Sequence, residues 1–391
     1  FMFGINPAIV LFMNGIGTLL FIFITKGKAP AYLGSSFAFI APATMVIDKW
    51  GYEYALGGFV VVGAIGCVLA AVIYKCGTRW IDIVLPPAAM GPVVALIGLE
   101  LAGSAASTGQ IVGDSVTTAS VITFCVTLGV AVLGSVLFRK FLSVIPILIA
   151  ILCGYAAGLV TEAFAGEHTI RDGIVAALQQ PLFQLPNFQA PKFDLEAILI
   201  ILPVILVIAN EHIGHQLVTS KVVGRDLLRD PGLHRSLFAD NFSTMLSGFI
   251  GSVPTTTYGE NIGVMAITRV YSVRVIGGAA VLSIICSFVG PLAALIQTIP
   301  GPVIGGISFL LYGMIGTSGL RILVDNKVDY SKNRNMVLTS VIFVVGLSGV
   351  TLSLGNVALS GMTLAAIVGM LMSLLFYAFD KLKWSNDLQD E

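Results

Sequence analysis

The sequence predicts an all-α polytopic membrane protein built as a seven-plus-seven inverted repeat, with two short strand and half-helix segments at membrane depth. Hydrophobic residues make up 56% of the 391 residues and charged residues only 11%, whereas about a quarter of an ordinary soluble domain is charged. Apolar runs of about 17 to 25 residues, the length that crosses a bilayer as a helix, follow one another along the chain. The two halves of the chain also share a pattern of spaced proline and glycine residues.

The charge and cysteine content exclude several classes of function. Lys and Arg together number 21, as do Asp and Glu, so the formal net charge is zero and a nucleic-acid partner is not expected. The five cysteines show neither a metal-binding spacing nor the pattern of a disulfide framework. We therefore expect no cofactor and no metal.

Thirteen segments are expected at membrane depth. They lie near 8–25, 30–47, 53–74, 82–105, 116–138, 142–163, 195–220, 233–251, 254–268, 273–298, 301–324, 335–351 and 361–380. All Lys and Arg residues except Lys49, Arg171 and Lys192 then fall on one side, which the positive-inside rule identifies as cytoplasmic. The C-terminus is thus expected in the cytoplasm and Phe1 outside. Because a chain without a signal peptide should begin inside, we expect one further span before Phe1 and fourteen in all.

Internal similarity supports a duplication. The spacing Pro87-x3-Gly91-x6-Gly98 recurs as Pro302-x3-Gly306-x6-Gly313. Seven spans in each half is an odd number, so the halves must have opposite orientations, as in secondary transporters. We expect a first repeat at 1–163, an external linker at 164–193 that could carry a short helix, and a second repeat at 194–391.

The segment 254–268 is too polar and too short for an ordinary span. Thr255 to Tyr258 favour an extended backbone, Gly259 allows a turn, and a helix is expected from Glu260 through Ile267. Similarly, Ser35-Ser36-Phe37 is expected to be extended, with a half-helix from about Ala38. Half-helices at membrane depth face protein or a watery cavity, and their positive N-terminal ends build transporter sites. The alternative is a re-entrant structural turn.

The segment 195–220 carries an ionisable pair. Glu211 and His215 are spaced i,i+4 and share a helix face, so the two side chains could form a hydrogen bond or exchange a proton. His212 is expected to point elsewhere. A buried ionisable pair marks a proton or substrate path. The alternatives are a histidine that only packs and a zinc site, although no second ligand cluster accompanies Glu-His-x-x-His.

Three further polar residues have ambiguous roles. Asp240 is as consistent with tying helices together as with function. Glu100 is expected near the external end of its helix, with its carboxylate reaching toward water. Tyr312 lies on a glycine-rich helix and is expected either to line the site or to pack in the core.

These residues together suit a small, flat solute. Glu211 and Glu260 accept N–H bonds, while backbone N–H groups near Phe37 and Gly259 donate to carbonyl groups. That alternation suits a pyrimidine-like ring. An anion or an amino acid would also suit helix N-termini.

The stretch Glu260-Asn-Ile-Gly-Val-Met-Ala-Ile-Thr-Arg269 resembles the signature of the nucleobase–ascorbate transporter family. The resemblance covers essentially the whole chain, including Ala31-Tyr-Leu-Gly-Ser-Ser-Phe37, Glu211-His-Ile-Gly-His215 and Leu311-Tyr-Gly313, and is closest to bacterial uracil:proton symporters. It implies a core domain of 1–74 plus 195–298, and a gate domain of 82–163 plus 301–380 through which a homodimer forms.

By the same resemblance, the chain is a transporter rather than an enzyme. It would import uracil with protons across the bacterial plasma (inner) membrane, as a multi-pass protein in the lipid bilayer. Glu211 and His215 would take part in proton coupling. The residues implied in binding the base are Ser36, Phe37, Glu211, Tyr258, Gly259, Glu260 and Tyr312.

Three alternatives remain at this point. Purine-selective relatives often carry Gln in place of Glu260, so Glu260 favours uracil over xanthine or urate, but a broader nucleobase permease is still possible. An anion exchanger of the same architecture is disfavoured by the two carboxylates. An intramembrane metalloenzyme would require a bound metal.

Overall fold

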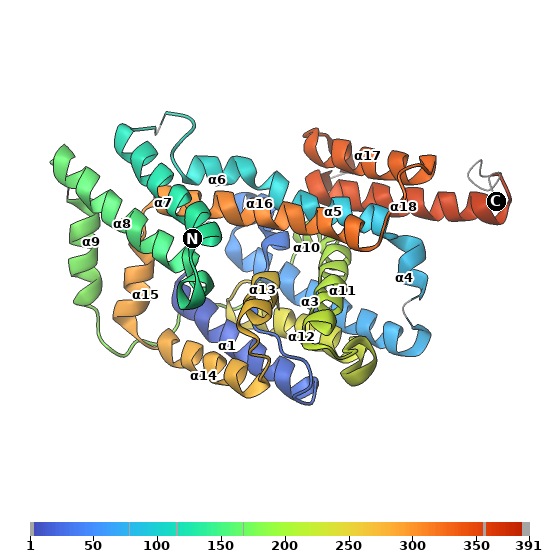
Figure 1. The fold of residues 1–391 in the computed structure, drawn as a ribbon, viewed down its shortest axis with the longest axis horizontal. Coiled ribbons are helices and arrows are strands. Elements are labelled where there is room, and N and C mark those ends of the chain that lie inside the picture. Colours follow the sequence, from blue (N-terminus) through green and yellow to red (C-terminus); the bar gives the residue numbers. More distant parts are fainter. Residues whose placement is uncertain (1–3, 78, 115, 167, 355–356, 385–391) are drawn as a thin grey trace.

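The computed structural model describes residues 4–77, 79–114, 116–166, 168–354 and 357–384, and they are mostly helical (Figure 1). The elements of the first half are α1 (Pro7–Ile24), β1 (Leu33–Ser35), η1 (Phe37–Phe39), α2 (Ile40–Trp50), α3 (Tyr52–Cys76), α4 (Arg79–Val84), α5 (Pro87–Glu100), α6 (Ala102–Thr108), α7 (Thr118–Leu137), η2 (Lys140–Val144), α8 (Pro146–Ala165) and α9 (Thr169–Leu178). Those of the second half are α10 (Leu195–Ile201), α11 (Val204–Val223), η3 (Leu228–Gly232), α12 (Leu233–Ile250), β2 (Thr255–Thr257), α13 (Gly259–Thr268), α14 (Val273–Ser287), α15 (Gly290–Gln297), α16 (Gly301–Asp325), α17 (Asn333–Leu347), β3 (Thr351–Leu354), β4 (Val357–Ser360) and α18 (Gly361–Lys381).

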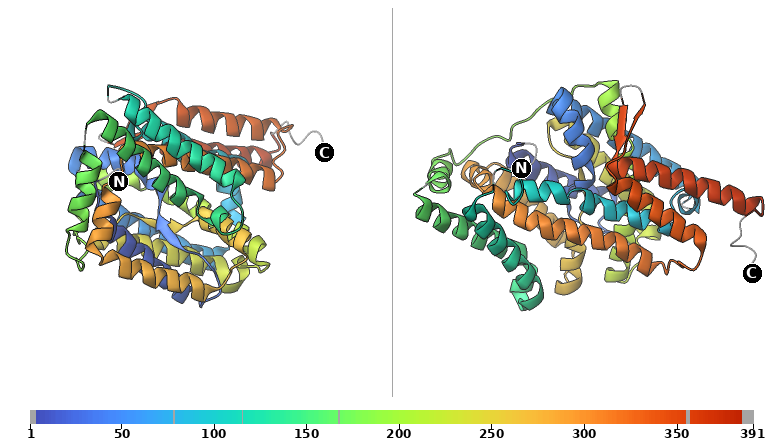
Figure 2. Two further views of the ribbon diagram at one scale, coloured as in Figure 1. Left: turned by 60° about the vertical axis from the view of Figure 1, so that its left-hand side comes forward. Right: turned by 90° about the horizontal axis from the view of Figure 1, so that it is seen from above.

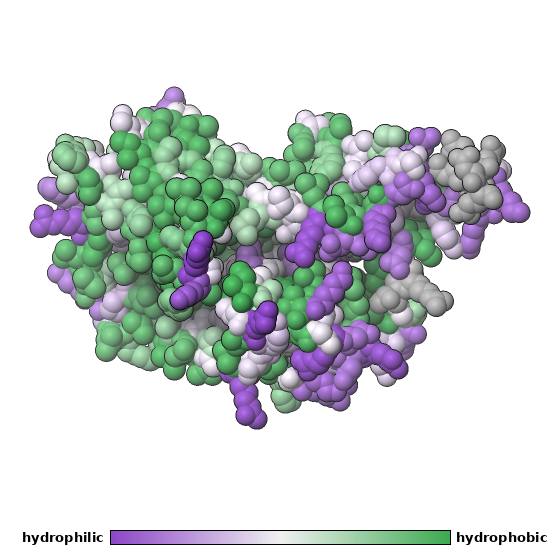
Figure 3. All heavy atoms as spheres, viewed as in Figure 1, coloured by the Kyte–Doolittle hydropathy of each residue, from purple (hydrophilic) through white to green (hydrophobic). Residues whose placement is uncertain are grey.

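Eight helices within the described residues are long and apolar enough to cross a membrane. They are Pro7–Ile24, Tyr52–Cys76, Pro87–Thr108, Thr118–Leu137, Pro146–Ala165, Leu195–Val223, Gly301–Asp325 and Gly361–Lys381. Pro87–Thr108 joins α5 and α6, and Leu195–Val223 joins α10 and α11. Large apolar side chains such as Leu282 and Ile285 of α14 are exposed, and hydrophobic residues cover much of the face seen in Figure 3, with hydrophilic residues gathered toward its lower right. An apolar exterior of this kind faces lipid, so the chain is a multi-pass membrane protein.

The long helices pack in two groups. One contains α1, α3, α12 and α14, and the other contains α5, α7, α8, α16, α17 and α18; they occupy the lower and upper parts of Figure 1. Glycines allow close approach inside each group. A Cβ atom on Gly66 of α3 would lie 1.9 Å from Oδ1 of Asn241 on α12, and one on Gly98 of α5 would lie 2.0 Å from the carbonyl oxygen of Tyr312 on α16.

The two predicted extended segments pair with each other in the interior. β1 and β2 are antiparallel, with Leu33 opposite Thr257 and Ser35 opposite Thr255, and Figure 2 shows them enclosed by helices. The Leu33 N–H also donates to Thr18 Oγ1 at 2.9 Å, which ties the pair to α1. Each strand leads directly into a half-helix, as expected. Phe37 was expected to be extended, but it already belongs to the 3₁₀ turn η1, and the helix becomes α-helical at Ile40.

Several boundaries differ from those expected. The segment 195–220 is divided into α10 and α11, because Pro203 has no N–H to continue the first helix. The segment 273–298 is divided into α14 and α15, where Val289 is extended before Pro291 enters the first turn. The segment 335–351 ends early at Leu347, and the hairpin of β3 and β4, which was not predicted, follows it. The short helix considered for the linker is present as α9.

Candidate functional site

The site is built where α11 passes the ends of the two short strands. Helix α11 contacts β2, α13 and η1, and η1 in turn contacts α5 of the other helix group. Two half-helices therefore begin beside the helix that carries Glu211 and His215. This brings the two polar regions singled out in the sequence to one place.

Asp240 fixes β2 to α12. Its Oδ1 accepts the Thr257 N–H at 2.9 Å, and its Oδ2 lies 3.5 Å from the Thr256 hydroxyl. The Thr244 hydroxyl of the same helix donates to the Thr255 carbonyl oxygen at 2.6 Å. Of the two roles considered for Asp240, the structure therefore shows the structural one, in which its carboxylate links α12 to β2 by hydrogen bonds.

The Thr257 hydroxyl lies between two imidazole rings. His215 Nδ1 is 3.2 Å from Thr257 Oγ1 and His212 Nδ1 is 3.4 Å from it. His212 Nδ1 is also 3.6 Å from Asp240 Oδ1. The expectation that His212 points elsewhere is wrong, because residues spaced i,i+3 lie on neighbouring parts of a helix surface and both rings face β2. Sequence reasoning missed Thr257, which was interpreted only as a residue that favours strands.

Glu211 has an unusual environment. Its Oε2 is buried and has no hydrogen-bond partner among the described residues. No hydrogen bond joins it to His215 within the described chain, because His215 Nδ1 faces Thr257 instead. A buried polar atom without a partner costs about 1–3 kcal/mol, and more when it is charged. Glu211 is therefore placed to receive a hydrogen-bond donor or a proton.

The start of α13 lies against His215. A Cβ atom on Gly259 would be 2.9 Å from His215 Nε2, so the glycine allows the half-helix to begin beside the ring. Tyr258, just before it, covers Gly34, where a Cβ atom would lie 2.2 Å from the tyrosine ring. The Tyr258 N–H also donates to the Tyr32 carbonyl oxygen at 3.2 Å. Tyr258 thus joins the two extended segments, and Glu260 follows in the first turn of α13.

The other half-helix places an aromatic pair beside the site. The rings of Phe37 and Tyr312 meet edge to face, with centroids 5.7 Å apart. Tyr312 is buried at 4% exposure in a cluster with Ile40 and Leu101. Because this pair joins η1 to α16, Phe37 and Tyr312 connect the two helix groups.

Ser36, just before η1, has a buried hydroxyl without a partner among the described residues.

Glu100 lies outside this cluster. Its Oε2 accepts the Met362 N–H at 2.9 Å, and Gly361 leaves room for the carboxylate, since a Cβ atom there would be 1.9 Å from Glu100 Oε1. A carboxylate is favourable at a helix N-terminus. Glu100 is half-buried and caps the first turn of α18, a contact that the sequence analysis did not predict.

No group of three or more His, Cys, Asp or Glu residues in the described part of the chain is placed to hold a metal ion. Comparison with known proteins then decides the class. The model of a family described as "Permease family" matches residues 5–355. The chain belongs to this family, that of the nucleobase–ascorbate transporters.

Relatives of this permease cover nearly all of its length. A protein named uracil permease from Escherichia coli (strain K12) is 55% identical over 96% of this chain and 86% of its own. Proteins of the same name from Paenibacillus larvae and Bacillus subtilis are 52% and 44% identical, over 98% and 95% of this chain and 90% and 87% of theirs.

Solved structures of low sequence identity share the fold of the permease. The transmembrane domain of the cyanobacterial bicarbonate transporter BicA is 13% identical, with a TM-score of 0.58 over 95% of this chain and 94% of that one. The murine anion transporter Slc26a9 in an inward-facing state is 12% identical, with a TM-score of 0.67 over 96% of this chain and 64% of that one. This likeness confirms the predicted inverted-repeat fold.

Proposed function

We propose that this permease imports uracil together with protons. The observation that carries the proposal is the buried, unpartnered Oε2 of Glu211, placed on a helix that contacts both half-helix starts. A ring N–H of uracil would satisfy that oxygen, and the relatives named uracil permease support this base as the substrate.

The base would be held between complementary groups. Glu211 and Glu260 accept its N–H groups, while backbone N–H groups near Phe37 and Gly259 donate to its carbonyl oxygens. Those N–H groups lie at half-helix starts, where the dipole favours negative partial charge. Phe37 and Tyr312 form an apolar wall. Ser36 and Tyr258 complete the extended segments around the base.

Proton coupling would arise from the same cluster. The carboxyl groups of Glu211, Asp240 and Glu260 lie in one region of the structure, so a proton bound there would relieve repulsion between like charges. His215 is one helical turn from Glu211 and touches the Thr257 hydroxyl. We propose His215 as the residue through which the proton reaches or leaves Glu211.

The domains would move against each other during transport. We propose residues 1–74 plus 195–298 as the core domain and residues 82–163 plus 301–380 as the gate domain, with a homodimer forming through the gate. The protein would lie in the bacterial inner membrane with its C-terminus in the cytoplasm. The positive-inside distribution of Lys and Arg supports this orientation.

Uptake of labelled uracil into proteoliposomes tests the function. An imposed inward proton gradient should accumulate uracil above the external concentration, and dissipating the gradient with a protonophore should abolish accumulation. Competition with unlabelled thymine, xanthine and urate measures the selectivity. Uptake that ignores the gradient would contradict proton coupling, and equal competition by xanthine would contradict selectivity for uracil.

A further inference from the structure

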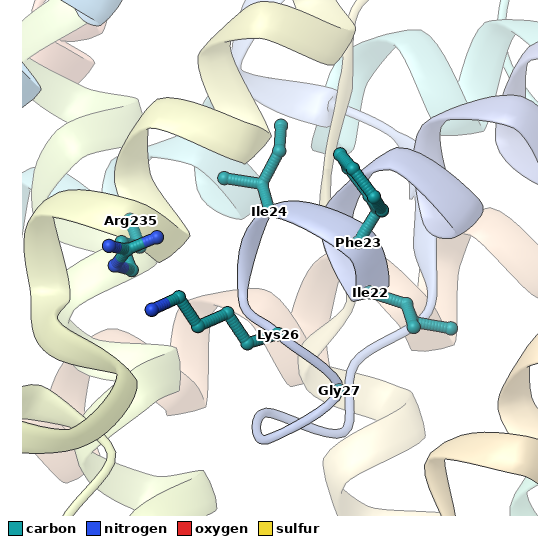
Figure 4. Close-up of a pocket in the computed structure, with 6 residues that line it drawn as sticks. All are labelled: Ile22, Phe23, Ile24, Lys26, Gly27 and Arg235. Atoms are coloured by element: carbon teal, nitrogen blue, oxygen red, sulfur yellow. The ribbon is translucent and has the colours of Figure 1, made fainter.

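The end of α1, the turn after it and the start of α12 line an open hollow that contains none of the candidate-site residues. It has a volume of about 650 Å³ and is shown in Figure 4. Its lining residues are Ile22, Phe23, Ile24, Lys26, Gly27 and Arg235. Because α1 is one of the helices that can cross the membrane, the hollow lies where a spanning helix leaves the hydrocarbon region.

Two cationic side chains line this hollow. Figure 4 shows the ammonium group of Lys26 turned toward the guanidinium group of Arg235. Neither group has a carboxylate within 4.0 Å among the described residues, whereas the neighbouring Lys28 is paired with Asp230 at 2.7 Å. Like charges that face each other repel, so an anion between them is favourable.

The rest of the hollow is apolar. Phe23 is 81% exposed, and Ile22 and Ile24 flank it on the last turn of α1. A small soluble anion without hydrocarbon groups would gain no stabilising contact from this apolar surface. A ligand with both a negative group and hydrocarbon chains fits both halves of the hollow.

We propose that this hollow binds the headgroup of an anionic phospholipid. The phosphate accepts hydrogen bonds from Arg235, which is suited to planar two-point contacts with phosphate oxygens, and Lys26 adds a point charge. The acyl chains lie along Phe23 and Ile22. The proposal concerns a surface away from Glu211 and Glu260, so it stands or falls independently of the transported solute.

The test uses the purified protein, titrated with phosphatidylglycerol in detergent, with bound lipid counted by native mass spectrometry. The double variant Lys26→Gln/Arg235→Gln should bind phosphatidylglycerol about thirtyfold more weakly, because each basic residue near an anionic lipid contributes about fivefold. The variant Lys26→Arg/Arg235→Lys keeps both charges and should retain most of the affinity.

A matched control removes charge elsewhere at the same end of the molecule. Arg229 is exposed and does not line the hollow, so Arg229→Gln should bind phosphatidylglycerol like the wild type. The proposal is overturned if the double glutamine variant still binds like the wild type, if Arg229→Gln loses as much, or if phosphatidylcholine binds equally well. Binding of soluble glycerol phosphate as tight as that of phosphatidylglycerol would also overturn it, since the site would then take a free anion.

Discussion

At the scale of single residues, the candidate site combines a carboxylate oxygen without a partner and a hydroxyl group that already has two. Glu211 Oε2 is buried and unpaired among the described residues, whereas Thr257 Oγ1 lies within 3.4 Å of both His212 and His215. These two environments suit two different parts of the proposed transport cycle. The first suits binding of a base, and the second suits control of where a proton resides.

Glu260 should matter for affinity. In Glu260→Ala a ring N–H of uracil loses its acceptor, so binding should weaken by about 1–3 kcal/mol. Isothermal titration calorimetry with uracil measures the loss. Wild-type affinity in the variant would remove Glu260 from the site.

His215 should separate binding from coupling. His215→Ala should keep measurable uracil binding but lose part of its pH dependence, and gradient-driven accumulation should fall. The coupling is reciprocal, so if protonation tightens uracil binding, uracil must raise the proton affinity of the cluster. Equilibrium binding at several pH values, measured beside proteoliposome uptake, checks this. Unchanged accumulation and an unchanged pH profile in His215→Ala would show that the proton does not pass through His215.

Thr257 should act through the imidazoles that it touches. Thr257→Val keeps the branched shape that favours the strand but removes the hydroxyl, so the pH profile of uptake should shift while β1 and β2 remain paired. Thr257→Ser restores the hydroxyl and serves as the matched control. If the valine and serine variants share one pH profile, the hydroxyl has no part in coupling.

At the scale of elements, the sequence predicted the two strand and half-helix segments because their composition is decisive. Three threonines and a tyrosine favour extension, and Gly259 permits the turn into α13. The hairpin of β3 and β4 was missed, although Thr351 to Leu354 alternate polar and apolar residues, a pattern typical of a strand. The break at Pro203 was missed because the surrounding residues form one uninterrupted apolar run.

Tertiary contacts explain the remaining misses at the site. Spacing places Glu211 and His215 on one helix face. It does not reveal that β2 passes close enough for Thr257 Oγ1 to lie within hydrogen-bond distance of His215 Nδ1. Nor does spacing show that Glu100 meets the start of α18, since Met362 is remote in the chain. Local sequence determines periodicity, whereas such partners depend on how helices far apart in the chain pack.

The packing of α5 against α16 should be intolerant of added volume. In Gly98→Ala the new methyl would meet the Tyr312 carbonyl at 2.0 Å, and overpacking of this kind costs about 1–3 kcal/mol. The apparent unfolding temperature in detergent should therefore fall. Gly313→Ala, on the same helix as Tyr312, is the matched control, because a Cβ atom there would meet nothing within 4 Å. Equal stability of the two variants would contradict this account of the interface.

At the scale of the whole molecule, the proposed orientation places the connection between α11 and α12 in the cytoplasm and the linker 164–193 outside. Arg229 and Gln180 are both exposed. A single cysteine introduced at either position of an otherwise cysteine-free protein shows on which side of the membrane that position lies. An impermeant maleimide applied to intact cells should label position 180 and spare position 229 until the membrane is opened. Labelling of position 229 from outside would overturn the assignment of sides.

The pairing of β1 with β2 has a consequence for how the protein is made. β1 belongs to the first half of the chain, and its partner is synthesised only when Thr255 to Thr257 emerge. At about 5–20 residues per second, the ribosome leaves β1 waiting on the order of ten seconds or longer. Throughout that interval its edge has no strand to pair with, in surroundings where unpaired backbone groups are costly. The nascent first half must therefore be shielded by the insertion machinery or by water, and its central segment settles only after the second half arrives.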